Sequence, residues 1–309
     1  MRVGVTGITS DLGRGLLPLL EADSRVERIT GFDVAEAPGG LSKLETVSLD
    51  LTRPGSDDEL TAALKAARVD ALMHLAFVNS RVHGAAFAHE LEVIGSMHVL
   101  AAAQATGLRR LVVPSWTALY GARRNGPALY TEDQPLLGAG VRFVTDRVEV
   151  ERQVESFAER NPATHVVVLR FAPIVGPNAD NPITRLLRTR FVPTVLGFDP
   201  LWQVIDERDA ARALHLALDC RAAGPFNIVC EDPLPFSVLV QLSGGRAVPM
   251  PGPVLRSTIR LLETTGVASV PVPLLDFLRY SWLGDGTRAA RELKFRPNFP
   301  AATAVGGLR

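Results

Sequence analysis

The chain has 309 residues, of which 47% are hydrophobic and 21% charged, which fits a globular protein with a full α/β domain and a smaller lobe. Its formal net charge at pH 7 is zero, so no overall field draws it onto nucleic acid or anionic lipid. No apolar run approaches the roughly 20 residues of a membrane-spanning helix, and the chain opens on a strand pattern rather than a secretory segment, so we expect a cytoplasmic protein without a membrane partner.

Strand and helix patterns alternate through the first part of the chain. Strand spacing covers Arg2–Thr6, Arg28–Asp33, Thr46–Leu49, Asp70–Leu75 and Leu111–Val113. Helical spacing covers Gly13–Ala22, Asp58–Ala67 and Ala86–Gly107, the last ended by its glycine. Repeated strand–helix units predict an α/β fold, a Rossmann-type doubly wound parallel sheet with helices on both faces.

The second half continues this pattern and then loses it. A helix is predicted over Val141–Asn161, a strand over His165–Arg170, a loop-rich stretch over Pro173–Pro200, a helix over Asp206–Asp219 and a strand over Pro225–Val229. Beyond residue 230 prolines recur and periodicity weakens. We therefore predict a Rossmann domain formed by residues 1–172 plus 203–230. Residues 173–202 plus 231–309 would form a substrate-binding lobe over the open end of the strands.

A glycine-containing turn joins the first strand to the first helix. It spans Thr6 to Gly13, with Asp11 and Leu12 beginning the helix. Gly7 allows a tight turn and Gly13 allows close packing of helix on strand, so backbone amides and the helix N-terminus can meet a pyrophosphate. Ser10 stands where a second glycine is usual, and its Cβ crowds the phosphates. The turn predicts nucleotide binding, with a vestigial turn as the alternative.

Asp33 ends the second strand and points to the choice of cofactor. A carboxylate there accepts hydrogen bonds from the adenosine ribose and repels a 2′-phosphate, which favours NAD over NADP. The alternative is a surface aspartate in a β–α turn. Arg14 would favour a phosphate, so the preference is not absolute. Asp50, after the third strand, is placed to reach the adenine amino group.

Several motifs, in order along nearly the whole chain, resemble one family. Asp70–Ala76 is similar to a D-x-V-x-H-L-A segment. The resemblance continues through Gly95-Ser96, Arg110–Ser115, Ala118–Gly121, Glu132-Asp133, Glu151, Leu169-Arg170, Val175–Pro177 and Phe226-Asn227. These are typical of extended short-chain dehydrogenases/reductases, the NAD-dependent epimerase/dehydratase family. The resemblance implies NAD as cofactor, a small-molecule substrate and a homodimer formed through the helices at Ala86–Gly107 and Val141–Asn161.

With this resemblance, the predicted cofactor-binding residues are Gly7, Ser10, Asp11, Leu12, Gly13, Asp33, Asp50, Leu51, Leu75, Ala76, Ser115, Arg147 and Pro173.

The catalytic positions of the family are filled by other residues. The resemblance implies a Ser or Thr that orients the substrate oxygen, a Tyr that exchanges a proton as hydride moves, and a Lys that lowers the pKa of that Tyr. Here these positions are Trp116, Phe143 and Arg147, and Glu151, four residues after Arg147, supports the register. Under any register the Tyr–Lys pair is absent, because no tyrosine has a lysine four residues on.

The replacements change the chemistry of the site. Phenylalanine has no exchangeable proton, and arginine stays charged and relays none. Arg147 can still donate to the nicotinamide ribose, whereas Trp116 fills the place of the substrate oxygen. We therefore expect ordinary carbonyl–alcohol interconversion to be lost or greatly weakened.

Other polar groups are candidates for a replacement proton source. Asn79 and His83 follow the fourth strand, and Asp206 begins a helix. For His83 the alternative is a solvated loop histidine, and for Asp206 an N-cap. His74 is predicted to be a hydrogen-bonded core histidine. The histidines lack metal-ligand spacing and pair with neither Cys220 nor Cys230, so we predict free thiols and no metal site.

Two functions remain open from the sequence. The first is an atypical NAD-dependent oxidoreductase or epimerase that acts on a small molecule by non-standard acid–base chemistry. The second is a non-catalytic NAD-binding sensor or assembly subunit. The substrate and the reaction type are not predicted.

Overall fold

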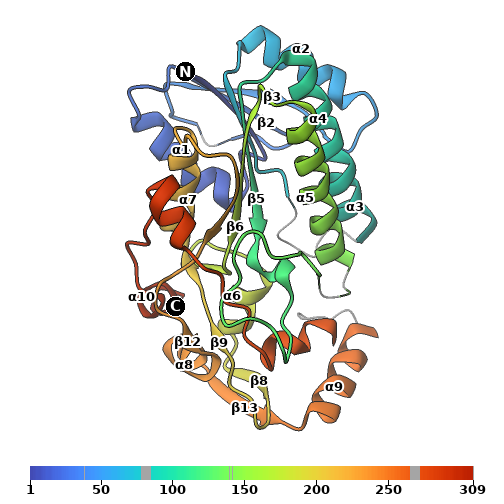
Figure 1. Cartoon of the computed structure of the whole chain (residues 1–309), viewed down its shortest axis with the longest axis vertical. Helices are drawn as coiled ribbons and strands as arrows, with labels where there is room; N and C mark the ends of the chain where they lie inside the picture. The colour runs from blue at the N-terminus through green and yellow to red at the C-terminus, as the bar shows by residue number, and fades with distance from the viewer. Residues whose placement is uncertain (38, 78–84, 139, 141, 265–271, 309) are drawn as a thin grey trace.

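A seven-stranded, fully parallel sheet forms the centre of the molecule, as the computed structural model shows (Figure 1). The structure describes residues 1–37, 39–77, 85–138, 140, 142–264 and 272–308. The strand order is β11-β6-β5-β4-β1-β2-β3. The strands are β1 (Arg2–Thr6), β2 (Arg28–Asp33), β3 (Leu44–Ser48), β4 (Ala71–His74), β5 (Arg110–Trp116), β6 (His165–Phe171) and β11 (Gly224–Ile228). The predicted Rossmann-type sheet is confirmed.

The central strands are apolar because helices cover both faces of the sheet. Val3 and Val5 of β1 and Met73 of β4 are fully buried. The fifth strand was predicted over Leu111–Val113, but β5 continues to Trp116. It does so because it pairs with β6 along its whole length, up to Trp116 opposite Phe171.

The helices form one layer on each face (Figure 1). α1 (Asp11–Ala22) and α7 (Glu207–Ala217) pack together on one face. α2 (Ser56–Ala67), α3 (Ala85–His89), α4 (Gly95–Thr106) and α5 (Arg142–Arg160) lie on the other. The carboxyl ends of the strands point towards the C-terminal lobe, so residues that follow these strands face that lobe (Figure 1).

The predicted helix Ala86–Gly107 is not one uninterrupted α-helix. A π-helical turn, η1 (Glu90–Ile94), separates α3 from α4. Such turns insert a residue into the helical repeat and often occur at functional sites. Here the turn carries the buried Glu92. Gly107 ends α4 in the left-handed conformation, as predicted, with φ of 61°.

The C-terminal lobe contains short elements around a core of its own. They are β7 (Ile174–Val175), α6 (Pro182–Leu187), β8 (Phe191–Val195), β9 (Leu201–Trp202), β10 (Ile205–Asp206), β12 (Leu234–Pro235), α8 (Phe236–Leu242), β13 (Arg246–Met250), α9 (Gly252–Thr264) and α10 (Ala301–Gly306). Trp202, Phe236 and Trp282 meet ring to ring in that core. The stretch predicted as loop-rich therefore contains β7, α6 and β8.

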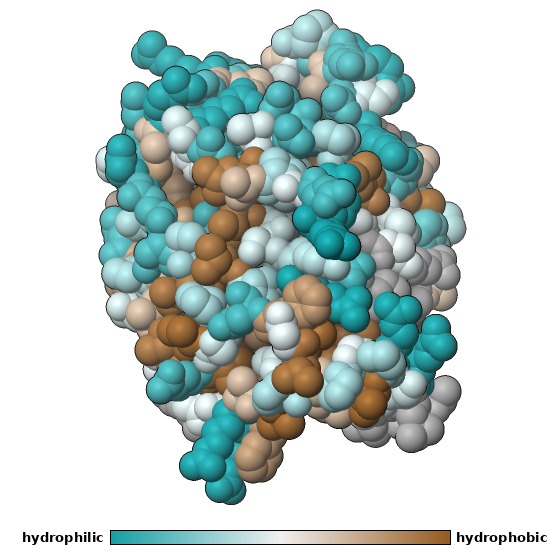
Figure 2. Space-filling model, turned by 60° about the horizontal axis from the view of Figure 1, so that its bottom comes forward, coloured by the Kyte–Doolittle hydropathy of each residue, from teal (hydrophilic) through white to brown (hydrophobic). Residues whose placement is uncertain are grey.

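Figure 2 shows brown, apolar patches on the face that it draws. The exposed apolar side chains of the lobe include Phe191, Leu196, Phe198, Val248 and Val254. Among the described residues, no helix is long and apolar enough to cross a membrane. Cys220 and Cys230 are buried free thiols, as predicted.

Candidate functional site

The turn after β1 has the geometry that its glycines predict. Gly7 has φ of 67°, and a Cβ on it would lie 2.5 Å from the Cα of Ala76 at the end of β4. A Cβ on Gly13 would lie 2.4 Å from the carbonyl oxygen of Ile8. Both positions therefore require glycine. The close approach of the turn to Ala76 brings the predicted residues Gly7 and Ala76 together.

Ser10 acts as the N-cap of α1. Its Oγ accepts a hydrogen bond from the backbone N–H of Gly13 at 3.1 Å. This N–H is one of the unpaired donors that a helix N-terminus offers to a phosphate. The serine thus satisfies one donor of the predicted pyrophosphate site, a role that its crowding Cβ alone did not suggest.

Asp33 lies at the end of β2 beside this turn and is half-buried. Its Oδ2 accepts from the backbone N–H of Thr9 at 3.0 Å and from the Thr9 hydroxyl at 2.9 Å. Its Oδ1 accepts from the N–H of Val34 at 2.8 Å and of Ala35 at 3.3 Å. The carboxylate is therefore held in a fixed orientation next to the nucleotide-type turn.

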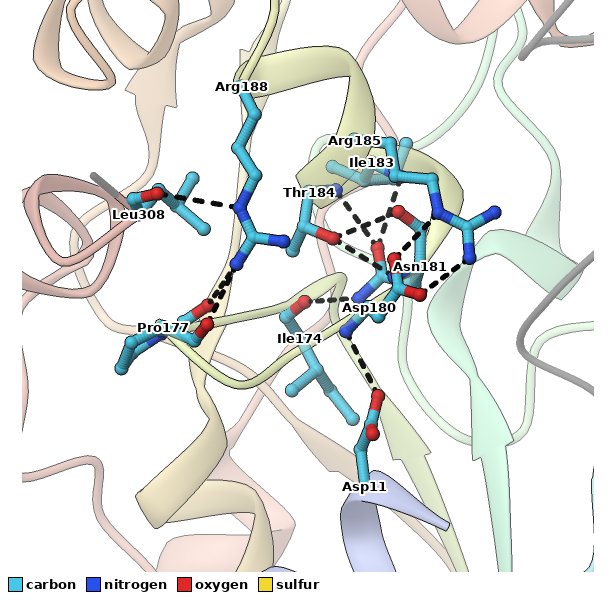
Figure 3. Close-up of polar contacts among 11 residues, drawn as sticks. Asp11, Ile174, Pro177, Asp180, Asn181, Ile183, Thr184, Arg185, Arg188 and Leu308 are labelled. Carbon is cyan, nitrogen blue, oxygen red and sulfur yellow. Dashed lines mark hydrogen bonds and ion pairs between the residues drawn. The ribbon is translucent and has the colours of Figure 1, made fainter.

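Asp11 connects the same turn to the C-terminal lobe (Figure 3). Its Oδ2 accepts from the backbone N–H of Asp180 at 2.9 Å, across 169 positions of sequence. The Asp180 carboxylate forms two hydrogen bonds with Arg185, at 2.6 and 2.7 Å, and this pairing lowers the pKa of Asp180. The first residue of α1 is thus used as a contact between the domain and the lobe.

The segment after β7 is itself firmly held (Figure 3). Asn181 caps α6, and its Nδ2 donates to the carbonyl of Ile174 at 2.7 Å. Arg188 donates to the carbonyls of Pro177 and Leu308, at 2.9 and 3.4 Å. The partner of Asp11 therefore belongs to an ordered part of the lobe.

The remaining predicted cofactor residues lie at the carboxyl ends of strands. Asp50 accepts from the backbone and hydroxyl of Thr52, at 3.0 and 2.6 Å. Leu51 and Leu75 are buried, and Pro173 is half-buried just before β7. The candidate proton sources Asn79 and His83 lie outside the described residues.

Arg147 lies in a closed environment. Its guanidinium donates to both oxygens of Glu92, Nε to Oε2 at 2.9 Å and Nη2 to Oε1 at 3.1 Å. The two side chains are only 2% and 3% exposed. The guanidinium carbon lies 3.9 Å from the ring centre of Phe77 and 4.2 Å from that of Trp116. Arg147, which the sequence predicts at the family's lysine position, is thus ion-paired and flanked by two aromatic rings.

Trp116 flanks this pair, and Phe143 belongs to the same helix as Arg147. Phe143 lies in the first turn of α5, and Trp116 ends β5. The neighbours of Trp116, Ser115 and Thr117, are both buried. The Ser115 hydroxyl, predicted to contact the cofactor, donates to Glu151.

Glu151, one helical turn after Arg147 in α5, belongs to a buried polar network. Arg170 donates to it from Nε and Nη2, the shorter bond being 2.7 Å, and donates from Nη1 to the Tyr120 hydroxyl at 2.9 Å. The Tyr120 hydroxyl in turn donates to Asn227 Oδ1 at 2.8 Å. Burial raises the pKa of Tyr120 to about 12. This tyrosine is therefore a neutral member of the core network.

Asp206 is the N-cap of α7, which was the alternative to its role as a candidate proton source. Its Oδ1 accepts from the backbone N–H of Arg208 at 2.9 Å, and its carboxylate pairs with the Arg208 guanidinium. The side chain is 1% exposed. These contacts give Asp206 a structural role at the start of α7.

His74 is the predicted core histidine. The Ser96 hydroxyl donates to the carbonyl of Glu92, so its oxygen accepts from His74 Nε2 at 3.0 Å. His74 Nδ1 then accepts from the Thr6 hydroxyl at 2.7 Å. Burial, and secondarily the charge of Arg147, lower the pKa of His74 to about 3. The imidazole is therefore neutral and connects β1 and β4 to Ser96 of α4.

This histidine should make folding pH-dependent. Between its ordinary pKa of 6.5 and about 3, the unfolded chain binds a proton that the folded chain does not. Its contribution to stability is then complete above about pH 6.5 and is lost as pH falls, by about 1.4 kcal/mol per pH unit. Urea unfolding from pH 7 to 4 measures this slope. We expect His74→Gln to flatten it, and an unchanged slope would contradict a neutral His74.

Three residues of the site were not found from the sequence: Glu92, Phe77 and Thr9. Glu92 had one signal, a carboxylate next to apolar residues in the predicted helix Ala86–Gly107. Phe77 and Thr9 had none, because their roles depend on contacts with Arg147 and Asp33 that only the fold creates.

The parallel sheet, the glycine turn and Asp33 at the end of β2 define a Rossmann-type α/β protein with a nucleotide-type first turn. The chain belongs to the NAD dependent epimerase/dehydratase family, whose sequence profile matches residues 3–229.

Relatives and solved structures agree with this assignment. An uncharacterized protein of Mycobacterium tuberculosis is 29% identical, over 97% of this chain and 81% of its own length. A 3-diazoavenalumate denitrifying reductase of a Streptomyces species is 27% identical, over 76% of this chain and 78% of its own. The structure of dTDP-glucose 4,6-dehydratase from Bacillus anthracis in complex with NAD has a TM-score of 0.74 at 15% identity, covering 100% of this chain and 95% of that one. The last likeness concerns the fold.

Proposed function

We propose that this protein binds NAD(H) and does not carry out the proton-coupled carbonyl–alcohol chemistry of its family. The observation that carries this proposal is the buried Arg147–Glu92 pair between Phe77 and Trp116. In this proposal Arg147 stands at the position of the family's lysine, and its guanidinium does not release a proton and so cannot relay one. The protein would then act as an NAD(H)-binding sensor or assembly subunit.

The residues present suit the cofactor. Close backbone packing at Gly7 and Gly13 forms the tight turn from which α1 begins, and the N-terminus of that helix would face the pyrophosphate. Asp33 presents a fixed carboxylate where an adenosine ribose would lie. Similar folds include a dehydratase solved with NAD. NAD, when bound, supplies a hydride acceptor or donor, and these residues would hold and orient its adenosine half.

Arg147 was predicted to contact the nicotinamide ribose, and we now propose that it stays with Glu92. Moving the guanidinium would break two hydrogen bonds of a buried ion pair, and separating such a pair is strongly unfavourable. The flanking aromatic rings add cation–π attraction in the same position. Cofactor affinity would therefore depend on the adenosine half rather than on this arginine.

A second function is favoured by one observation, the match to the Streptomyces reductase over most of both chains. That protein is named a reductase. Reduction by hydride transfer to an acceptor that takes no proton from the protein would need neither the tyrosine nor the lysine of the family. This function differs from the first in requiring that NADH be consumed.

Isothermal titration calorimetry tests the proposal. We expect NAD to bind more tightly than NADP, because Asp33 repels a 2′-phosphate. Asp33→Ala should narrow that difference, while Asp50→Ala, a carboxylate after the next strand, should preserve it. Equal affinities, or a preference for NADP, would overturn the cofactor assignment. Loss of NADH absorbance with electron-poor acceptors would favour the reductase over the sensor.

A further inference from the structure

The acceptor positions of Asp33 are already filled by the protein. An ionised carboxylate offers about four lone-pair positions. Three are taken by backbone N–H groups, those of Thr9, Val34 and Ala35, and the fourth by the Thr9 hydroxyl at 2.9 Å. A ribose hydroxyl that donates to Asp33 must therefore displace one of these donors.

The Thr9 hydroxyl is the donor best able to leave. The three amides are fixed by the chain, whereas the threonine hydroxyl belongs to a side chain. It is also half-buried at the turn where the adenosine would lie. The ribose and Thr9 thus compete for the same oxygen, Oδ2 of Asp33.

We propose that Thr9 is an affinity-determining residue, which weakens NAD binding by occupying Asp33. The inference rests on the proposed function, since it concerns the same cofactor site. Thr9 acts through Asp33 and is therefore a positioning residue. It would set the cofactor affinity lower than the glycine turn and Asp33 alone would give.

Thr9→Val tests this directly, because valine keeps the branched shape and removes only the hydroxyl. One net hydrogen bond corresponds to roughly a 3- to 10-fold change in Kd. We expect calorimetry to show NAD binding tighter by that factor in Thr9→Val and unchanged in Thr9→Ser. In an Asp33→Ala background, Thr9→Val should have no effect, which separates competition for Asp33 from a general effect on the turn.

The results distinguish this inference from the function on which it rests. No NAD binding by the unmodified protein would remove the proposed function. Measurable NAD binding that Thr9→Val leaves equal or makes weaker would overturn the inference alone. A gain of equal size in the Asp33→Ala background would also overturn it, since the effect would then not pass through the carboxylate.

Discussion

Glu92→Gln should destabilise the protein by about 3–5 kcal/mol, the usual cost of leaving one member of a buried ion pair without its partner. Glutamine has nearly the shape of glutamate but no charge, so the Arg147 guanidinium would remain buried and uncompensated. The side chains are 2% and 3% exposed, and solvent cannot replace the lost carboxylate. Urea unfolding measured at pH 7 gives the difference in free energy.

A matched control uses an exposed pair. Arg28 and Glu45 lie 3.1 Å apart, and their side chains are 50% and 59% exposed. Glu45→Gln should therefore change the stability far less than Glu92→Gln. The double variant Glu92→Leu with Arg147→Met should recover most of the loss, since Phe77 and Trp116 already provide apolar surroundings. If Glu92→Gln and Glu45→Gln changed the free energy of unfolding equally, the buried Glu92–Arg147 ion pair would not have the predicted importance for stability.

We expect the unmodified protein to show no sugar-nucleotide epimerisation, and rebuilding the family's proton relay should produce NAD-linked turnover. General acid–base groups contribute about 10²–10⁴-fold to rate. Phe143→Tyr alone should help little, because the Trp116 ring stays against Arg147, where we expect it to fill the place of the substrate oxygen. The triple variant Trp116→Ser, Phe143→Tyr and Arg147→Lys supplies all three groups, and NADH absorbance with alcohol and carbonyl substrates measures the gain.

The structure adds one residue to this design. A lysine at position 147 would meet the Glu92 carboxylate and be held there, instead of acting on the tyrosine that Phe143→Tyr introduces. We expect the triple variant combined with Glu92→Gln to exceed the triple variant alone. If instead the unmodified protein turns over NAD with a simple alcohol or ketone, and Phe143→Tyr leaves that rate unchanged, the proton comes from elsewhere. Asn79 and His83 would then be the first residues to replace.

The fold was predictable because local patterns and the final packing agree. Buried parallel strands read as apolar runs, and glycine at positions 7 and 13 is required by contacts of 2.5 and 2.4 Å. The position of Asp33 at the end of β2 was predictable because it follows from the order of the elements. His74 was assigned to the core from its place in a buried strand, and its two hydrogen bonds agree.

The contact between Arg147 and Glu92 was not predictable from sequence. Arg147 and Glu92 are 55 residues apart, and their contact depends on a π-helical turn that interrupts a regular helical pattern. Apolar spacing alone predicts one continuous helix there, with no reason to turn a carboxylate towards α5. Likewise, Thr9 reads as a turn residue until β2 places Asp33 against it.

A crystal structure of the protein with NAD tests most directly whether the cofactor site is retained while the relay is closed. We expect NAD with its adenosine ribose at Asp33, and Arg147 still donating to both oxygens of Glu92 at about the present 2.9 and 3.1 Å. An Arg147 that leaves Glu92 and donates to the nicotinamide ribose would contradict the closed relay.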